Sequence, residues 1–392
     1  MIASLLSNEI QEFISKNLGI NITKFALQKN PFPEVPWIEI LNQVAAKSKA
    51  KEKLPTWYAT ENIIYPSKIS VEQTSSEKTA QYKSNIVSGE SLIDLTGGFG
   101  VDDYYFSKKI NRVIHCELNA ALSEIVAHNF KILKKDSIRC LHGDSSDILK
   151  ELDQKFDWIY IDPSRRSNAK GKVFMLKDCL PDVPKLLEEY FLFSNKIVVK
   201  TAPILDITAG LTELRNVKTI HIVAVNNEVK ELLWEIEKDY DDAITIKTIN
   251  FNKEKEDTFN FILNDEIATN VYSSPKKYIY EPNAAILKSG AFELVANHFN
   301  IEKLHQHSHL YTSNEIIDFP GRIFEIRNSF EYDKIEMKQF LENTKANITT
   351  RNFPETVEAI RKKWKISDGG GIYTFFTTDA NNRKIVLICA KI

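Results

Sequence analysis

Four acidic side chains stand at the ends of successive short apolar runs in this sequence. In chain order they are Asp94, Glu117, Asp144 and Asp162. Carboxylates at such places can accept hydrogen bonds from hydroxyl and amino groups of a bound ligand, and an acidic residue after a second strand is suited to ribose hydroxyls. Each one alone is most often a surface carboxylate, but their order and regular spacing predict one shared ligand site.

The elements that must position these carboxylates follow from an alternation of apolar runs and helical patterns. Strands are predicted at 91–95, 113–116, 138–141, 158–161, 196–199 and 219–225. Helices are predicted between the earlier ones, at 102–109, 120–133, 147–152 and 181–190. This rhythm indicates βαβ units and a parallel sheet, and the apolar runs fit a sheet that is covered on both faces.

The first of these strands runs into a glycine-rich turn, Asp94-Leu95-Thr96-Gly97-Gly98-Phe99-Gly100. A strand, such a turn and then a helix form the layout of a nucleotide-type pocket, because glycines let the backbone turn tightly and approach a ligand closely. The dinucleotide fingerprint has a third glycine where this chain has Asp103, whose carboxylate would repel a pyrophosphate. NAD and FAD are therefore disfavoured, and the remaining alternative is a plain strand-turn-helix corner with an N-capping Asp.

The same turn resembles the acidic-x-G-x-G-x-G turn of class I S-adenosylmethionine (SAM) methyltransferases, with Thr96 in place of the first glycine. SAM carries no phosphate, and its positive sulfonium and amino groups make a nearby carboxylate favourable. The resemblance implies that Asp94 lies beside the methionine portion of SAM, that Glu117 binds the ribose hydroxyls and that Asp144 accepts from the adenine amino group. The full set of cofactor-binding residues that it implies is Asp94, Thr96, Gly98, Gly100, Glu117 and Asp144.

The fourth strand ends in Asp162-Pro163-Ser164-Arg165-Arg166, which resembles the D-P-P-Y or N-P-P-Y reaction corner of amino-group methyltransferases. Asp162 and Pro163 are therefore the expected catalytic residues, and Asp162 would orient an acceptor nitrogen for in-line attack, mainly by positioning it. Ser164 and Arg165 replace the second proline and the aromatic ring, so the platform on which a flipped base would stack is missing. Arg165 and Arg166 are expected to bind substrate, by contacting phosphate or by stacking their guanidinium planes, although a solvated pair on a loop is the alternative.

From about residue 70 to residue 392 the chain resembles bacterial class I SAM-dependent methyltransferases with a THUMP-like C-terminal domain. Besides the turn and the reaction corner, which is usually D-P-A-R-R in that family, the matching segments are 72–77 (E-Q-T-S-S-E) and 278–283 (Y-I-Y-E-P-N). The resemblance implies an α/β fold with a Rossmann-like methyltransferase sheet, a helical N-terminal region, and small α+β domains, ferredoxin-like and THUMP-like, at the C-terminus. The expected divisions are 1–88, 89–270, 271–320 and 321–392. THUMP domains in other enzymes bind RNA, commonly tRNA.

Length and composition fit a soluble protein of several domains. The 392 residues suggest two or three domains, and a content of 43% hydrophobic and 27% charged residues excludes a largely disordered chain. No apolar run approaches the roughly 18 residues that a membrane span needs, and residues 1–12 lack the basic start of a secretory signal. Four cysteines without C-x-x-C spacing argue against a zinc ribbon or a disulfide framework and fit a reducing cytoplasm.

A net charge of −2 means that any contact with nucleic acid must come from local patches. Residues 321–392 hold 13 Lys and Arg against 9 Asp and Glu, and their run 361–365 (R-K-K-W-K) could follow an RNA backbone or form the polar face of a helix. His305, His307 and His309 alternate as they would on one face of a strand. Zinc accepts imidazole ligands, but no Cys or helical His spacing supports such a site, and no metal is expected.

These observations predict methyl transfer from SAM, the expected cofactor, to a base nitrogen of RNA, either tRNA or rRNA, without a membrane partner. Two alternatives stay open. One is a methyltransferase with a protein or small-molecule acceptor, which Ser164 and Arg165 favour; the other is a catalytically silent module that binds SAM or RNA. The sequence predicts neither the oligomeric state nor the role of the helical N-terminal region.

Overall fold

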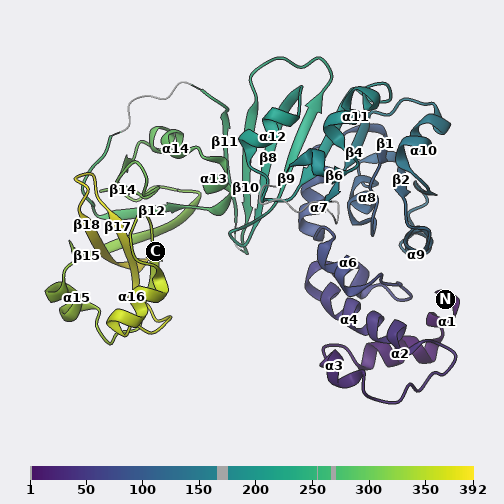
Figure 1. Cartoon of the computed structure of the whole chain (residues 1–392), viewed down its shortest axis with the longest axis horizontal. Coiled ribbons are helices and arrows are strands. Elements are labelled where there is room, and N and C mark those ends of the chain that lie inside the picture. Colours follow the sequence, from purple (N-terminus) through teal and green to yellow (C-terminus); the bar gives the residue numbers. More distant parts are fainter. Residues whose placement is uncertain (1, 166–174, 254, 266–270) are drawn as a thin grey trace. The chain divides into compact units, whose positions relative to one another are not determined.

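The computed structural model describes residues 2–165, 175–253, 255–265 and 271–392 (Figure 1). The chain divides into two compact units: the first comprises Met1–Val217 and Trp234–Asp241, and the second comprises Lys218–Leu233 and Asp242–Ile392. Both units mix helices and strands, which confirms the predicted α/β class with smaller α+β parts. The finer division at residues 88, 270 and 320 stays a prediction. Among the helices within the described ranges, none is long and apolar enough to cross a membrane.

The N-terminal region of the first unit is helical and has its own apolar core. Its first helices are α1 (Ile2–Leu5), α2 (Asn8–Lys16), α3 (Ile22–Phe25), α4 (Trp37–Lys53) and α5 (Pro55–Ala59). α2 begins at Ser7, whose hydroxyl accepts a hydrogen bond from the N–H of Ile10 and so satisfies one of the free donors of the first turn. Ile10 and Ile14 on its buried face belong to one apolar cluster with Leu41 and Val44 of α4.

The pattern over 71–87, which predicts one helix with Ser70 as its possible N-cap, is formed by two helices. α6 (Lys68–Gln73) begins at Ser67 and α7 (Glu77–Ser84) begins at Ser76, because each serine hydroxyl accepts from the backbone N–H three residues further on. Thr74 has extended backbone angles and separates the two helices. The single-helix prediction is therefore wrong, and the break places polar residues at the cavity described below.

A parallel sheet forms the centre of the first unit. Its strands are β1 (Gly89–Asp94), β2 (Ile110–Glu117), β3 (Ile138–His142), β4 (Trp158–Ile161) and β7 (Lys196–Thr201). They lie in the order β7-β4-β1-β2-β3, and every neighbouring pair is parallel. All side chains of β4 are buried, as expected for a strand in the middle of a covered sheet. The carboxyl ends of β1, β2, β4 and β7 therefore meet along one edge.

A further strand of the first unit follows Lys218–Leu233, a segment that belongs to the second unit. Trp234–Asp241 includes the end of β9 (Glu228–Glu237), which lies next to β7. Trp234 is fully buried, and its indole N–H donates to the hydroxyl of Thr201 at 3.0 Å. A Cβ atom on Gly210 would lie only 2.4 Å from the Trp234 ring, so this position accepts glycine alone without rearrangement.

Helices and short elements connect the parallel strands. They are α8 (Val101–Phe106), α9 (Ala120–Ile132), α10 (Ser145–Leu152), α11 (Val183–Tyr190), α12 (Ile207–Glu213), the 3₁₀ turn Leu176–Asp178, and the short antiparallel pair β5 (Ser164–Arg165) and β6 (Cys179–Leu180). The strands and helices predicted between 91 and 190 are thus present, which confirms the βαβ interpretation.

The second unit begins with strands and continues into a second sheet. β8 (Val217–Val225) is parallel to β10 (Thr245–Phe251), which pairs in antiparallel fashion with β11 (Glu256–Ile262). In the second sheet the described strands lie in the order β13-β14-β12-β15-β18-β17-β16. Their bounds are β12 (Tyr278–Pro282), β13 (Glu302–Lys303), β14 (Tyr311–Ser313), β15 (Gly321–Glu331), β16 (Asn347–Thr350), β17 (Tyr373–Thr378) and β18 (Lys384–Lys391). The helices of this unit are α13 (Ala284–Ser289), α14 (Phe292–Phe299), α15 (Lys334–Phe340) and α16 (Val357–Trp364).

Two details of the second unit differ from the sequence-based expectations. The sequence pattern over 283–299 predicts one helix, but the structure has two, because Gly290 adopts a φ of 74° and ends α13. The segment with His305, His307 and His309 lies in turns between β13 and β14 and not on a strand face, and the His309 ring stacks on Phe292. The three imidazoles therefore do not share the strand face that their alternation indicates.

Candidate active site

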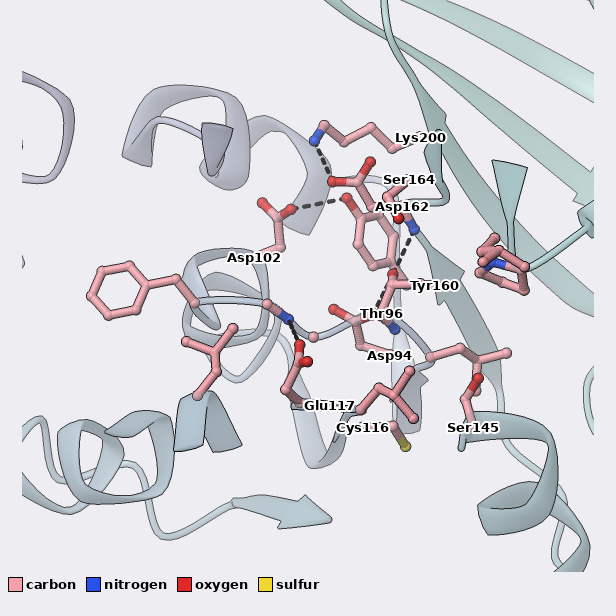
Figure 2. Close-up of a pocket in the computed structure, with 18 of the residues that line it drawn as sticks. Asp94, Thr96, Asp102, Cys116, Glu117, Ser145, Tyr160, Asp162, Ser164 and Lys200 are labelled. Carbon is pink, nitrogen blue, oxygen red and sulfur yellow. Dashed lines mark hydrogen bonds and ion pairs between the residues drawn. The ribbon is translucent and has the colours of Figure 1, made fainter. Parts of the chain in front are cut away.

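A cavity of about 1020 Å³ opens at the carboxyl edge of the parallel sheet, within the first unit (Figure 2). The predicted residues that line it are Asp94, Thr96, Gly98, Glu117, Asp144 and Asp162. Gly100 and Pro163 do not line it. Of the two arginines, Arg165 is described only through its backbone in β5, and Arg166 lies outside the described residues. Gln73, Thr74 and Ser75, from the break between α6 and α7, complete one wall.

The glycine-rich turn after β1 takes its shape from close contacts and from left-handed backbone. A Cβ atom on Gly97 would lie 2.1 Å from the His115 ring, so only glycine fits there. Gly98 has a φ of 57° and Gly100 a φ of 74°, which glycine adopts without strain. A Cβ on Gly100 would also lie 2.5 Å from Phe130. Gly100 thus serves the packing of the turn, whereas the Gly98 backbone faces the cavity.

Thr96, which replaces the first glycine of the family turn, connects the ends of two strands. Its backbone N–H and its hydroxyl donate to Asp94 Oδ1, at 2.7 and 3.1 Å. The same hydroxyl accepts from the backbone N–H of Asp162 at 2.6 Å. The ends of β1 and β4 are therefore held together at the edge of the cavity (Figure 2).

Asp94 belongs to a group of buried titratable side chains behind the turn. Burial raises the pKa of Asp94 well above its ordinary value, and the neighbouring Asp103 carboxyl raises it further. Asp103 is itself fully buried, and its Oδ2 lies 2.6 Å from Nδ1 of His115. Burial raises the pKa of Asp103 and lowers that of His115, so each favours its neutral form.

The position of Asp103 corrects one step of the sequence interpretation. Its side chain points to His115 and does not line the cavity. It cannot repel a pyrophosphate in the cavity in the way that its place in the fingerprint indicates. Repulsion by Asp103 therefore no longer excludes a dinucleotide ligand, and the other residues of the cavity must decide between a dinucleotide and SAM.

Glu117 and Asp144 both line the cavity while they also bond to the backbone. Glu117 accepts from the N–H of Gly98 at 3.0 Å and from the N–H of Asn119 at 2.7 Å. Asp144 is the N-cap of α10 and accepts from Ser146 N–H at 2.9 Å. Each carboxylate oxygen has more than one lone pair, so both residues keep acceptor capacity for a ligand. Leu118, directly after Glu117, is 70% exposed at the cavity and provides an apolar surface for a flat ring.

Asp162 forms an ion pair with Lys200, a residue that the sequence analysis did not single out. The Nζ of Lys200, near the end of β7, donates to Oδ2 of Asp162 (Figure 2). The Asp162 side chain is 38% exposed and the Lys200 side chain 13%, and both line the cavity. This part of the cavity therefore holds a hydrogen-bond acceptor and a donor side by side.

A second, deeper polar network surrounds Asp102, at the start of α8. Asp102 accepts hydrogen bonds at Oδ2 from the hydroxyls of Ser75 and Tyr160, both at 2.9 Å, and its Oδ1 lies 3.0 Å from Lys83 Nζ. Lys83 has no exposed side-chain surface and also donates to Ser75 at 2.8 Å. Burial alone would raise the pKa of Asp102, but the charges of Lys83 and Lys200 lower it. This network joins α7 of the N-terminal region to the floor of the cavity.

The charges of the cavity suit a cationic ligand. Its described lining includes six acidic residues and two lysines. The raised pKa of Asp94 favours its neutral form, and Asp102 and Asp162 are paired with lysines. The remaining charged groups are Glu117, Asp144 and Asp182 against Lys185. An adenosyl group with a positive chain would contact the partly exposed Gly98, the acceptor groups of Glu117 and Asp144, and the apolar Leu118. These residues fit SAM. Within the described ranges, no group of three or more His, Cys, Asp or Glu side chains is arranged to hold a metal ion.

Comparison with known proteins agrees with these observations. Family models match the chain at residues 278–320, described as a ferredoxin-like domain, and at 321–391, described as THUMP domain-like. Over nearly its whole length the chain is similar to the crystal structure of a "putative methyltransferase" from Porphyromonas gingivalis W83. The two are 30% identical, the match covers 99% of this chain and 98% of that chain, and the TM-score is 0.85. No curated protein matches the chain.

Two further solved structures are similar over less than half of the chain. The "putative methyltransferase yhhF" from Escherichia coli is 19% identical over 42% of this chain and 85% of its own, with a TM-score of 0.31. TrmK from M. capricolum, solved in complex with S-adenosyl-homocysteine, is 10% identical over 45% of this chain and 70% of its own, with a TM-score of 0.33.

Proposed function

The chain belongs to the bacterial class I SAM-dependent methyltransferases with a THUMP-like C-terminal domain, and from this premise we propose that it transfers the methyl group of SAM to a base nitrogen of tRNA or rRNA. The observation that carries the proposal is the position of Asp162. Its partly exposed carboxylate lies at the cavity, and its backbone N–H donates to the Thr96 hydroxyl, which in turn donates to Asp94. An acceptor held by Asp162 would thus adjoin the methyl donor.

Each residue has a separate task in this proposal. Asp94 and the Gly98 backbone would hold the methionine end of SAM, Glu117 the ribose hydroxyls and Asp144 the adenine amino group. SAM supplies an electrophilic methyl group, so no metal is required for activation. Asp162 accepts a hydrogen bond from the acceptor nitrogen and fixes its direction, which is catalysis by positioning. Pro163 directly after it is buried and would limit the movement of this corner.

RNA as the substrate is supported by the domain content of the chain. Residues 321–391 match a THUMP domain-like model, and residues 321–392 have an excess of basic side chains. Phosphate contacts from such a domain would position the RNA without selecting its sequence. Arg361 and Lys363 are already engaged within the domain, with Asp368 and Glu355, whereas Lys362 and Lys365 are exposed. The exposed lysines are therefore the better candidates for phosphate contacts.

A protein or small-molecule acceptor is the second candidate, and the aromatic side chains of the cavity favour it. Among the described lining residues the aromatic rings are Phe99 and Tyr160, which are only 4% and 1% exposed. Neither offers an open face on which a flipped base could stack. Such a platform is unnecessary for an amide or amine of a protein.

The test is transfer of radiolabelled methyl from SAM into RNA, protein and small-molecule fractions from a strain that lacks this gene. We expect label in tRNA or rRNA with the wild-type enzyme and none with Asp162→Ala. Asp136→Ala is the matched control, because Asp136 is an exposed aspartate outside the cavity. Label in protein or small molecules alone would support the second candidate. SAM binding without transfer to any fraction would favour a binding module.

A further inference from the structure

The Asp162–Lys200 pair is the feature of the cavity that the family resemblance does not explain. The two residues stand at the ends of neighbouring parallel strands, β4 and β7, and their charged groups meet at the cavity (Figure 2). A carboxylate accepts hydrogen bonds and an ammonium only donates them. The pair therefore presents an acceptor and a donor next to each other, at a separation fixed by the ion pair.

The surroundings hold this pair in place from both sides. The Asp162 backbone is bonded to Thr96, and Lys200 is close enough to Asp102 for its charge to help lower the pKa of Asp102 against the effect of burial. Asp102 in turn is bound by Lys83, Ser75 and Tyr160. Groups that are oriented before the substrate arrives need no reorganisation during the reaction.

We propose that Asp162 and Lys200 together recognise an amide- or amidine-type edge, in which the N–H to be methylated and a hydrogen-bond acceptor are attached to the same carbon. This inference rests on the proposed function and specifies its substrate class. The base-pairing edges of nucleobases have this arrangement at N1 of guanine, N3 of uracil and the exocyclic amino groups. Asp162 would accept from the N–H, and Lys200 would donate to the neighbouring oxygen or ring nitrogen.

The burial of Lys200 decides between a base and the RNA backbone as its partner. With only 13% of its side chain exposed, Lys200 is too deep to meet a phosphate on the outside of an RNA strand. An aliphatic amine offers no acceptor for a further hydrogen bond from Lys200 and would bring a second positive charge beside its ammonium. A ribose hydroxyl, or a nitrogen that carries no hydrogen, would leave Asp162 without its N–H partner or Lys200 without an acceptor.

The transfer step itself is balanced. The lone pair of the acceptor nitrogen forms the N–CH₃ bond while the S–CH₃ bond of the donor breaks, and the sulfur keeps the bonding electrons. The N–H proton passes to the Asp162 carboxylate and from there to water. Lys200 takes no part in the bond changes and acts as a recognition residue.

The experiment identifies the methylated atom by hydrolysing the labelled substrate to nucleosides and comparing them with standards. We expect the methyl group on N1 of guanine, N3 of uracil or an exocyclic amino nitrogen. A 2′-O-methyl nucleoside, a C-methyl base, or methylation at N7 of guanine or N1 of adenine, which carry no hydrogen, would overturn the inference while leaving RNA methylation intact. If the label is in protein, the proposed RNA function fails, but methyl on an amide nitrogen still supports this inference, and methyl on a guanidino nitrogen, an amine or a hydroxyl overturns it.

Variants of Lys200 test the pair itself. For Lys200→Met we expect kcat/KM for the labelled substrate to fall about tenfold or more, since a charge-assisted hydrogen bond is lost, while SAM affinity stays within about twofold. Lys196→Met, which removes an exposed lysine from the other end of β7, is the matched control and should leave both unchanged. If Lys200→Met does not bind SAM, the test uses Lys200→Arg instead, which keeps a hydrogen-bond donor. This variant should alter the KM for the labelled substrate more than the affinity for SAM. Unchanged kcat/KM in a SAM-binding Lys200→Met enzyme would contradict the proposal.

Discussion

The Thr96 hydroxyl accepts a hydrogen bond from the backbone N–H of Asp162 at 2.6 Å, so the cofactor turn and the reaction corner share one side chain. We expect Thr96→Val to lower kcat/KM for methyl transfer about tenfold. The variant loses two hydrogen bonds of the hydroxyl, one to Asp94 and one from Asp162, each with a net worth of about 1 kcal/mol. Thr96→Ser keeps the hydroxyl and should retain most of the activity. Steady-state transfer assays of the two variants check this, and equal activity in both would contradict the bridging role.

Gly97 is the position of the turn with the least space. We expect Gly97→Ala to reduce the free energy of unfolding by about 1–3 kcal/mol, because the added Cβ would collide with the buried His115 ring. Gly371→Ala is the matched control: no atom lies within 4 Å of the added Cβ. Urea unfolding of both variants is the measurement. A loss of similar size in the control would show that the effect does not come from His115.

The buried Asp103 should make stability depend on pH. Since burial raises the pKa of Asp103, its stabilising contribution is complete below the unfolded-state pKa of about 3.9 and is lost as the pH rises toward the native pKa. In Asp103→Asn the amide can still donate to His115, and it does not titrate. We therefore expect the stability of the wild type relative to the variant to fall with rising pH, by up to about 1.4 kcal/mol per pH unit.

Urea unfolding of both proteins at a series of pH values rising from the unfolded-state pKa of about 3.9 measures this difference. Both proteins contain His115, so its own titration contributes to each curve. A difference that is constant with pH, or that grows in favour of the wild type at higher pH, would contradict the assignment.

Lys83 and Asp102 form a buried ion pair whose disruption should be costly. We expect Lys83→Met to reduce the free energy of unfolding by about 3–5 kcal/mol, because the buried carboxylate is left without its cation. The double variant Lys83→Met/Asp102→Asn should recover part of this loss, since it removes the unpaired charge. A double-mutant cycle by urea unfolding measures the coupling. Strictly additive losses would mean that the two residues do not stabilise each other.

Two exposed lysines, Lys362 in α16 and Lys365 directly after it, provide the test of RNA delivery. We expect Lys362→Gln/Lys365→Gln to weaken RNA binding and to reduce the salt slope by about 1 for each phosphate contact that is lost. Arg361 and Lys363 are unsuitable because they form ion pairs within the domain. Lys51→Gln/Lys131→Gln removes two exposed lysines elsewhere and serves as the control. Binding titrations at several salt concentrations check both, and an unchanged slope in the first variant would exclude these contacts.

The common location of Asp94, Glu117 and Asp162 could be predicted from local sequence patterns alone. Each of them follows or ends an apolar strand, and a parallel sheet brings the carboxyl ends of its strands to one edge. Lys200 obeys the same rule: it is a polar residue near the end of an apolar strand, and this signal was present in the sequence. The directions of side chains on helices were not accessible in this way. Asp103 points inward to His115 because of how α8 is rotated against the sheet, and residue spacing alone does not determine that rotation.

The Asp102 network could not be inferred from the sequence for a related reason. Lys83 and Ser75 lie in the helical N-terminal region, and their partner Asp102 follows a strand and a turn. Nothing in the local pattern of 75–83 indicates a buried lysine, because a lysine on a helix is ordinarily solvated. The break between α6 and α7 brings Ser75 to the cavity. The local pattern predicts a continuous helix there, because it contains no information on the distant residues that Ser75 contacts.

The chain passes between the two units three times, since Trp234–Asp241 returns to the first unit after Lys218–Leu233 has left it. The methyltransferase sheet is therefore unfinished when residue 217 leaves the ribosome: Gly210 still lacks the Trp234 indole against it and Thr201 lacks its donor. Co-translational folding of the catalytic half must wait until residue 241 has been synthesised. Expression of a fragment that ends at residue 217 would leave an open apolar slot, and the shortest autonomous catalytic fragment has to include the β8–β9 hairpin.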